Sequence, residues 1–556
     1  MHGARPGGRE EAWVEADLPE FDSLRMPALG TGGMVASSQP LATAAGLRIL
    51  ASGGNATDAC VATAAALAVT EPCNTGIGGD CFALFYDAAS GAVSALNGSG
   101  RAPAELTLER VQAAGLEGAI PWSHPLAITV PGACAGWQDT LERFGTLPLA
   151  RVLEPAVELA ERGFPVAPIA ARQWALGARI QLSRQPGGHE LLLDGRAPRP
   201  GEIFRNPGMA RTLRTVAEHG KKGFYEGAPA RAIAAAVQSA GGCLSEADLA
   251  EHRSTWETPI STVYRDLRVW ECPPNGQGLA ALLALNLVGG FDLASLDPLG
   301  PDRWHLLIEA MRLAFADARP LIADPAMVPI PVDELLSPAY ADTRRREIDP
   351  RRANLEARAG QPLGGSDTVY FCAVDARGNA CSFINSNYWM FGTGIVPEGF
   401  GFPLQNRGSG FSLDPGHANA LAPRKRPYHT IIPGLLTREA DGSLYGPFGV
   451  MGGFMQPQGH LLVASALADD GLDPQRALDR PRFCINSGTA DGEVALEQGL
   501  PEATAAELEA RGHAVSRVSG FARVQFGRGQ VIRRDPNGAL WGGSDPRADG
   551  CAMPLS

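Results

Sequence analysis

The sequence predicts a mixed α+β protein in which largely apolar helices pack against strands that are paired as hairpins. Apolar residues recur at helical spacing in residues 40–50, and residues 56–69 are rich in alanine and valine with little charge. Both segments are expected to be helices, the second buried on most sides. Two runs of β-branched and aromatic residues are each followed by a turn and a second run, which is typical of β-hairpins. Their strands are expected at residues 81–86, 92–96, 369–374 and 379–384.

The middle of the chain, residues 104–360, alternates amphipathic helices with loops rich in proline and glycine. It is expected to supply helical packing around the sheets and little chemistry. Residues 340–366 are charged and then glycine-rich, as in an exposed linker, and the dense charges at 344–352 are typical of a solvated helix face. A further apolar helix is expected to begin at Gln456. Examples of the helices expected in the middle region are residues 150–162, 231–240, 279–287 and 303–318.

Composition narrows the class of protein. The 556 residues include 60 acidic and 48 basic side chains, which give a net charge of −12. This balance argues against a nucleic-acid or anionic-membrane surface, and no apolar run approaches the roughly 20 residues that span a bilayer. A small anionic substrate stays possible, because one local arginine can dominate a pocket. The ten cysteines show no CxxC pair and no metal-like spacing, so we expect reduced, mostly buried thiols. We also expect no metal and no organic cofactor.

The N-terminal residues 1–32 are expected to form a poorly ordered leader without a targeting role. They carry acidic residues where a signal peptide would be hydrophobic. We therefore expect a cytoplasmic protein.

One stretch, GGSDTVYFCAVD, places Thr368 at the first position of a predicted core strand, directly after a polar linker. A threonine hydroxyl becomes a good nucleophile when a base lies beside it. If the bond between Asp367 and Thr368 is cut, the new α-amino group is that base. Its ordinary pKa of roughly 7.7–8.0 suits a general base near neutral pH. On this stretch alone, a threonine that simply opens an ordinary strand is the commoner interpretation.

From residue 33 to the C-terminus the chain resembles the γ-glutamyltranspeptidase family of N-terminal-nucleophile hydrolases. Nine motifs occur in the family's order and cover nearly the whole chain. It looks closest to the γ-glutamyltranspeptidase-like amidohydrolases, whose members include oxamate amidohydrolase. The matching motifs are GMVASSQPLATAAGLRILASGGNATDA, TEPCNTGIGGDCFALFYD, GSGRAP, VPGACAGW, DTVYFCAVDARGN, FGTGIV, KRP, MGG and SDPR.

The resemblance implies a four-layer αββα fold, with two stacked sheets between helices. It also implies that the precursor cleaves itself between Asp367 and Thr368. The large fragment, residues 33–367 after the leader, and the small catalytic fragment, residues 368–556, would then form a heterodimer within one globular domain.

The resemblance also assigns site residues. Thr368 is the nucleophile, and Ser386 falls where the transpeptidases have a supporting threonine. Gly452 and Gly453 match the oxyanion hole, where glycines let backbone N–H groups approach a developing negative oxygen. Asp80 closes a glycine-rich loop that lies near the active site in the family, and it is kept as a further candidate.

The substrate pocket departs from the transpeptidase pattern. The arginine that clamps the glutamyl carboxylate falls on Ser99, two residues before Arg101, so Arg101 either takes over that role or is a surface residue. The asparagine that holds the glutamyl amino group is Tyr388, and the acidic residue that binds it falls on Gly410.

Cationic or polar groups replace neutral ones elsewhere in the same pocket. Arg407 stands on a glutamine position, and His429 and Thr430 stand on a pair of serines. Packing roles are the alternative for Arg407 and His429. Because a buried ammonium without a partner costs several kcal/mol, a γ-glutamyl group should bind poorly.

The expected function is therefore hydrolysis of a small amide that carries a carboxylate, such as oxamate, through an acyl-enzyme at Thr368. The loop at 412–425 is short, so we expect an open pocket that admits water and favours hydrolysis over transfer. Three alternatives stay open: a true γ-glutamyltransferase or glutathione hydrolase, an acylase of a secondary-metabolite pathway, and a catalytically silent binding relative.

Overall fold

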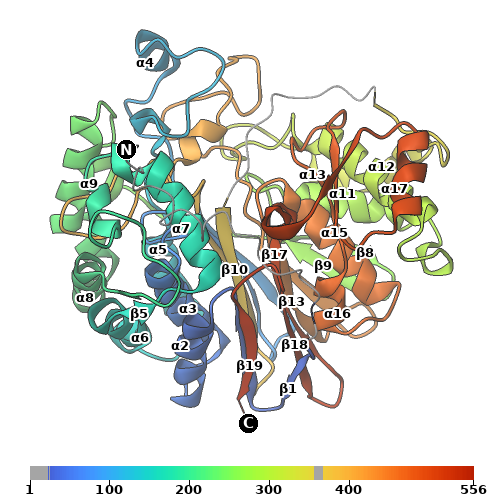
Figure 1. Cartoon of the computed structure of the whole chain (residues 1–556), viewed down its shortest axis with the longest axis horizontal. Helices are drawn as coiled ribbons and strands as arrows, with labels where there is room; N and C mark the ends of the chain where they lie inside the picture. The colour runs from blue at the N-terminus through green and yellow to red at the C-terminus, as the bar shows by residue number, and fades with distance from the viewer. Residues whose placement is uncertain (1–22, 24, 356–366, 556) are drawn as a thin grey trace, which may run out of the picture.

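The computed structural model describes residues 23, 25–355 and 367–555, with the backbone alone for residue 367. Within these residues two antiparallel seven-stranded sheets lie face to face at the centre of the molecule (Figure 1). The first sheet has the order β1 (Ala28–Gly30), β18 (Leu540–Ser544), β17 (Arg528–Arg534), β13 (Leu444–Met451), β12 (Gly434–Arg438), β9 (Leu267–Glu271) and β8 (Ile260–Tyr264). The second has the order β19 (Cys551–Leu555), β2 (Gly33–Ser37), β10 (Asp367–Asp375), β11 (Ala380–Tyr388), β3 (Asp80–Tyr86), β4 (Val93–Gly98) and β7 (Thr255–Glu257).

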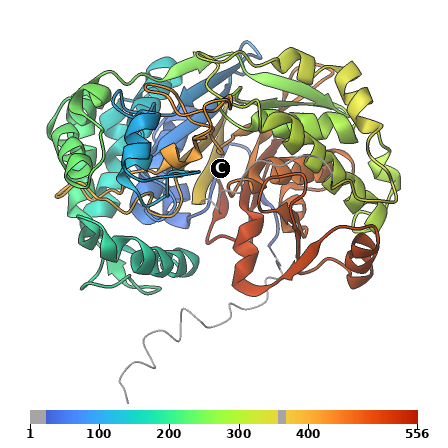
Figure 2. The same ribbon diagram turned by 90° about the horizontal axis from the view of Figure 1, so that it is seen from above.

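Helices cover the outer face of each sheet, as the two views in Figures 1 and 2 show. The helix α3 (Ala56–Thr70) packs on β10 and β11, with α2 (Pro40–Ala51) and α6 (Leu149–Arg162) beside it. On the other side α15 (Met455–Ala468) packs on β13, and α11 (Gly278–Val288) packs on β8 and β9 with α12 (Pro301–Ala318) outside it. These layers confirm the four-layer αββα fold.

Smaller elements complete the molecule. A three-stranded sheet and a two-stranded pair lie outside the two central sheets. The remaining helices are α4 (Leu108–Ala113), α5 (Ala133–Phe144), α7 (Pro168–Ile180), α8 (Pro207–Tyr225), α9 (Ala228–Ser239), α10 (Glu246–Ala250), α13 (Val332–Leu335), α14 (Pro338–Arg345), α16 (Pro474–Asp479) and α17 (Glu502–Ala510). The remaining strands are β14 (Phe483–Ile485), β15 (Val494–Glu497), β16 (Val515–Val518), β5 (Phe164–Pro165) and β6 (Ile203–Phe204).

The helix α3 forms a buried support for the strand that carries Thr368. The Asn55 side chain accepts from the N–H groups of Thr57 and Asp58, and the Asp58 carboxylate accepts from the N–H of Asn55. This capping box satisfies donors that a helix start would otherwise leave unpaired. Every residue of α3 is buried, which explains its near absence of charge.

The two faces of β10 have different surroundings because side chains alternate along a strand. Phe371 belongs to the core that β10 shares with α3. Tyr370 and Cys372 belong to the core between the two sheets, together with Met451 of β13. The even-numbered residues of β10 therefore face the other sheet.

Three sequence-based expectations need correction. Residues 28–30 were expected within a poorly ordered leader, but they form β1, the edge strand of the first sheet, and pair with β18, which gives their backbone groups hydrogen-bond partners. The region 104–360 was expected to supply helical packing, but it also contributes β7, β8 and β9 to the sheets. The linker expected at 340–366 begins inside α14, and its residues 356–366 lie outside the described residues, as do residues 1–22.

The SDPR motif forms part of a buried charge cluster. Arg547 is fully buried and pairs in a bidentate manner with Glu497, at 2.6 Å on both sides. Its third donor group binds Asp545 at 3.0 Å, and the other oxygen of Asp545 accepts from Arg482 at 2.7 Å. The motif thus has a structural explanation that does not involve chemistry.

We predict that Arg547→Met lowers the free energy of unfolding by about 3–5 kcal/mol, because it leaves two buried carboxylates undercompensated. Urea unfolding would measure the change. Arg517→Met is the matched control, because Arg517 pairs with Glu502 on the exposed surface and its loss should not move the midpoint measurably. Equal midpoints for Arg547→Met and the wild type would show that the cluster adds nothing to stability.

Candidate active site

Thr368 lies at an irregularity in the pairing of β10 with β11. The register pairs Asp367 with Tyr388 and Val369 with Asn385. Between these two pairs β10 contributes one residue, Thr368, whereas β11 contributes two, residues 386 and 387. Such a bulge re-aims the side chains beside it. Here the Thr368 and Ser386 hydroxyl oxygens lie 3.0 Å apart, within hydrogen-bond distance.

The strand is continuous through the bond between Asp367 and Thr368, so the structure represents the uncleaved chain. In this state the Thr368 side chain is completely buried. Thr368 is buried because it lies inside a central strand, on the face that meets the other sheet. The open pocket that the sequence predicted for the active enzyme stays a prediction.

Ser386 connects Thr368 to a buried arginine. The Arg407 guanidinium donates to the Thr430 hydroxyl at 2.9 Å and to the Ser386 hydroxyl at 3.4 Å. The Tyr388 ring lies 3.9 Å from the guanidinium carbon, in a cation–π contact. The structure thus brings together Thr368, Ser386, Tyr388, Arg407 and Thr430.

Arg407 is fully buried, and its Nε atom has no hydrogen-bond partner. Among the described residues no carboxylate forms an ion pair with it. Burial lowers the pKa of Arg407 to about 10, while Tyr388 and Asp80 act in the opposite direction. The guanidinium therefore remains charged at neutral pH, as a buried cation that lacks a paired anion.

Tyr388 adopts a backbone conformation that is unusual for its residue type. Its φ is +78°, in the left-handed region that costs a residue with a side chain about 1–2 kcal/mol. Its N–H donates to the Ser386 hydroxyl at 2.8 Å. The conformation lets one residue fix Ser386 through its backbone and Arg407 through its ring.

His429 is held in one tautomer by its neighbours. The Ile431 N–H donates to His429 Nδ1 at 3.4 Å, so the proton lies on Nε2 and is donated to Asp80 at 3.1 Å. Burial, reinforced by the charge of Arg407, lowers the pKa of His429 to about 3. His429 is therefore neutral and contributes no positive charge to the site.

Asp80 is the buried acidic group of this region, and its carboxylate is fully occupied. Besides the His429 proton, it accepts from the Gly100 N–H at 2.9 Å, the Gly132 N–H at 3.2 Å and the Gln405 amide at 2.9 Å. Asp80 therefore holds four chain segments together, those of Gly100, Gly132, Gln405 and His429.

The residues Gly452 and Gly453 follow β13 directly and precede α15. Their φ values are +137° and +61°, which favour glycine. Within the part of the chain that the structure describes, neither N–H donates a hydrogen bond. Unpaired backbone donors are what an oxyanion hole requires. The Gln277 amide joins this segment to the rest of the site, since it donates to both the Gly453 and the Thr430 carbonyls.

Arg101 lies apart from this cluster. Its guanidinium pairs with Asp324 at 3.0 Å and donates to the Arg424 carbonyl at 3.2 Å. It lines a cavity of about 290 Å³ together with His252 and Glu251. The structure therefore shows no contact between Arg101 and the other predicted site residues, and a role in holding substrate stays a prediction.

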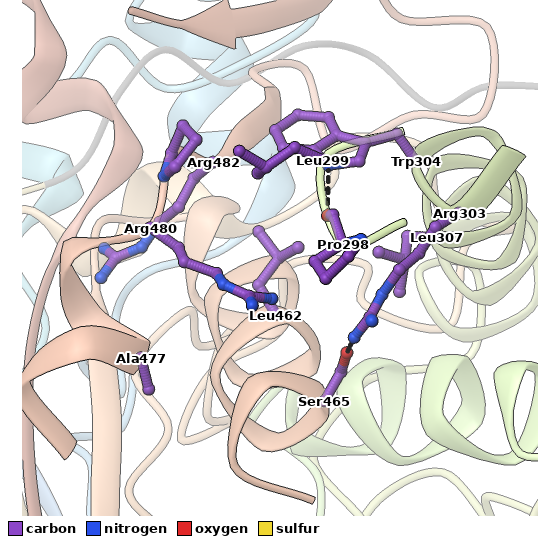
Figure 3. A pocket seen from close by; sticks show the side chains of 11 residues that line it. Pro298, Leu299, Arg303, Trp304, Leu307, Leu462, Ser465, Ala477, Arg480 and Arg482 are labelled. Atoms are coloured by element: carbon purple, nitrogen blue, oxygen red, sulfur yellow. Dashed lines mark hydrogen bonds between the residues drawn. The ribbon is translucent and has the colours of Figure 1, made fainter. Parts of the chain in front are cut away.

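A second cavity, of about 20 Å³, lies between α12, α15 and the segment after α16 (Figure 3). In it Arg303 donates to the Ser465 hydroxyl, and the Trp304 indole donates to the Pro298 carbonyl. None of the predicted site residues lines this cavity. It is a packing gap between helices, too small for a substrate.

Two contributors were missed by reasoning from the sequence. Gln277 and Gln405 both lie in loops, and only the folded chain brings their amides to Gly453 and Asp80. The run Pro-Pro-Asn-Gly-Gln-Gly at residues 273–278, between β9 and α11, was the available signal, because polar residues in a strand-to-helix loop often serve a site.

The profile of the Gamma-glutamyltranspeptidase family matches residues 42–555. The chain belongs to this family. Family members with a similar sequence include the glutathione hydrolase-like YwrD proenzyme of Bacillus subtilis, 38% identical, covering 94% of this chain and 99% of the relative. The oxamate amidohydrolase proenzyme of Klebsiella pneumoniae is 35% identical, with 94% and 98% covered.

Among solved structures of the family fold, the cephalosporin acylase from Bacillus halodurans superimposes with a TM-score of 0.89 at 46% identity, covering 97% of this chain and 98% of that one. These relatives agree with the observed layers and establish the chain as an N-terminal-nucleophile hydrolase.

The described residues contain no helix with the length and apolar character to cross a bilayer. Nine of the ten cysteines are buried, and no disulfide links the described residues.

We predict that His429→Gln makes stability less sensitive to acid. The wild-type imidazole stays neutral when folded but binds a proton below its ordinary pKa of about 6.5 when unfolded. Its contribution is complete above pH 6.5 and is lost as the pH falls toward 3, by about 1.4 kcal/mol per pH unit. Glutamine can still donate to Asp80 but does not titrate.

Urea unfolding of both proteins at pH 7 and about pH 5 would measure the difference. His252 and His513, whose pKa values burial also lowers to about 3, are present in both proteins, so the comparison isolates one group. Identical losses of stability between the two pH values would contradict a neutral buried His429.

Proposed function

We propose that the chain is a self-cleaving threonine amidohydrolase that hydrolyses a small amide carrying a carboxylate, of the oxamate type. The observation that supports it best is Arg407, a fully buried guanidinium two hydrogen bonds from the Thr368 hydroxyl and without an acidic partner among the described residues. An uncompensated buried charge is costly. A substrate carboxylate would supply the missing partner through bidentate hydrogen bonds.

Cleavage is the first step of the proposal. The Thr368 hydroxyl attacks the carbonyl carbon of Asp367, the C–N bond breaks, and the acyl group moves to the Thr368 oxygen as an ester. Water then hydrolyses the ester, which gives a carboxylate on Asp367 and a free amine and hydroxyl on Thr368. The names of the YwrD and oxamate relatives describe proenzymes, which supports such a step here.

Turnover uses the same hydroxyl. The Thr368 amine takes the hydroxyl proton as the oxygen attacks the substrate amide carbon. The N–H groups of Gly452 and Gly453 stabilise the tetrahedral oxyanion. The Thr368 ammonium then passes its proton to the substrate nitrogen, which leaves as an amine or as ammonia, and water hydrolyses the acyl-enzyme. Ser386 holds the nucleophile, Arg407 and Thr430 hold the substrate carboxylate, and Tyr388 positions Arg407.

The two fragments are expected to remain associated as a heterodimer. In the second sheet β10 pairs with β2 on one side and β11 on the other, and in the first sheet β12 pairs with β9. Each sheet therefore contains strands from both sides of the cut. Separation would expose the edges of both sheets and the core between them.

A true γ-glutamyl hydrolase is less compatible with this site. None of the four residues that the structure brings to Thr368 carries a carboxylate. Asp80, which pairs with Ser386 in the sheet, already accepts four hydrogen bonds, so a substrate ammonium would compete with those donors. An acylase is the second candidate, because the cephalosporin acylase from Bacillus halodurans is 46% identical over nearly the whole chain.

A substrate panel separates these candidates. Ammonia release from oxamate, p-nitroaniline release from γ-glutamyl-p-nitroanilide, and deacylation of a cephalosporin with a side-chain carboxylate would be measured on the processed protein. Turnover of oxamate well above the γ-glutamyl substrate is expected. The opposite order would overturn the proposed substrate class, and no turnover by a processed protein would favour a silent relative.

We predict that Thr368→Ala abolishes both cleavage and turnover, because the variant lacks the attacking oxygen. Intact mass under denaturing conditions would show one species near 58.3 kDa. The wild type would give two fragments, one of which begins with Thr368. Thr368→Ser is the control, because it retains a hydroxyl and should still be cleaved. A Thr368→Ala protein that is cut or active would exclude the mechanism.

We predict that Arg407→Met lowers kcat/KM for oxamate at least about 30-fold, since truncating a buried charge partner costs about 2–5 kcal/mol. Hydrolysis of acetamide, which has no carboxylate, should fall much less. Arg303→Met is the matched control, because Arg303 is equally buried but pairs with Asp470. An equal loss for both amides would assign Arg407 to structure and not to substrate binding.

A further inference from the structure

Gln277 lies at the start of α11, is completely buried, and joins three parts of the site through one side chain. Its Nε2 donates to the Thr430 carbonyl at 2.6 Å and to the Gly453 carbonyl at 2.7 Å. Its Oε1 accepts from the Tyr428 hydroxyl at 2.8 Å. Its backbone N–H also donates to the His429 carbonyl at 3.1 Å.

The orientation of this amide follows from its neighbours. Two backbone carbonyls face one end, and carbonyls only accept, so that end must be the NH₂ group with its two donors. The Tyr428 hydroxyl then donates to the oxygen at the other end. The reversed amide would place three oxygens together in a buried space. Only one orientation of the amide therefore satisfies every hydrogen bond. In that orientation the Gln277 side chain fixes the distance between Thr430 and Gly453.

The Gly453 segment needs such an anchor. Two consecutive glycines with positive φ have no Cβ to restrict them. On one side the Met455 N–H donates to the Gly452 carbonyl, and the Gln456 N–H donates to the Gly453 carbonyl at 3.2 Å. Those bonds fix the segment to its own helix. The Gln277 side chain fixes Gly453 to the 428–430 segment, and Thr430 in turn accepts a hydrogen bond from Arg407.

We propose that Gln277 is a positioning residue that sets the distance between the oxyanion-hole amides and the wall of the substrate pocket. This inference rests on the proposed function, in which Gly452 and Gly453 receive the oxyanion. Its effect should be on kcat, because the amides stabilise charge that develops only in the transition state. A misplacement of about 1 Å at such a site costs roughly 10²-fold in rate.

The test measures the acylation of Thr368 by p-nitrophenyl acetate in a single turnover. Two readouts monitor it: the burst of nitrophenolate and the increase in mass of the small fragment. Gln277→Met preserves length and volume but removes both donors and the acceptor. We expect a burst rate 10- to 100-fold below wild type. For oxamate we expect a fall in kcat with KM changed by less than about threefold, because Arg407 is retained.

Gln475→Met is the matched control. Gln475 is also a buried glutamine with a fully used amide, which donates to Asp479 and the Ser544 carbonyl and accepts from the Ser544 N–H. It lies on α16, away from the site. Its loss should lower the thermal midpoint about as much as Gln277→Met, with the burst rate unchanged. Gln277→Met with a lowered midpoint but a wild-type burst rate would overturn the proposal.

Tyr428→Phe provides a milder second variant in case Gln277→Met does not fold. It removes only the hydroxyl that holds the Gln277 oxygen, and a burst rate lowered threefold or more is expected. A wild-type rate in Tyr428→Phe, when Gln277→Met cannot be purified, would also count against the inference.

Because p-nitrophenyl acetate is an ester and not an amide, this test of Gln277 can succeed or fail independently of the test for oxamate hydrolysis. Any acyl transfer to Thr368 needs the oxyanion hole, whatever amide the enzyme prefers. A wild type that is acylated by the ester but does not hydrolyse oxamate would overturn the substrate class and leave the role of Gln277 measurable.

Discussion

The site depends on keeping one guanidinium charged inside the protein. Arg407 is completely buried, and a cation in that position is stable only if the surrounding groups replace its hydration shell. Tyr388 places the face of its ring against the cation, the Thr430 and Ser386 hydroxyls accept hydrogen bonds from it, and Asp80 acts from further away. Each of these residues also contacts another residue of the site. The groups that stabilise this one charge therefore determine how the site is arranged.

This constraint explains the unusual features nearby. Tyr388 accepts a strained φ of +78° because that conformation directs both its ring and its N–H to useful partners. His429 is neutral because burial, reinforced by the charge of Arg407, lowers its pKa, and its remaining proton is donated to Asp80. The carboxylate of Asp80 then balances the site without pairing directly with Arg407.

Much of this arrangement could be predicted from the sequence. The hairpin containing Thr368, the helix α3 and the Gly452–Gly453 turn follow from periodicity, composition and family motifs, and the αββα layers follow from the resemblance. The pairing of Arg407 with Tyr388 could not be predicted, because the residues lie on different elements and meet only through the bulge opposite Thr368. Arg101 was placed near the pocket from its sequence position. In the folded chain its guanidinium pairs with Asp324, a contact between residues far apart in the sequence, and its role in holding substrate stays a prediction.

On the proposed mechanism Arg407 has a second effect, on the base. The hydroxyl of Thr368 is two hydrogen bonds from the guanidinium, so the amine released by cleavage would lie near a cation. A like charge disfavours protonation, which keeps the empty enzyme's amine in the neutral form that a general base needs. When a substrate carboxylate pairs with Arg407, that repulsion is reduced, and the amine can hold the proton it takes from the hydroxyl. A γ-glutamyl ammonium would add positive charge at the same moment and oppose that transfer. The cation that selects the acyl group would therefore also couple substrate binding to the proton transfer that begins the reaction.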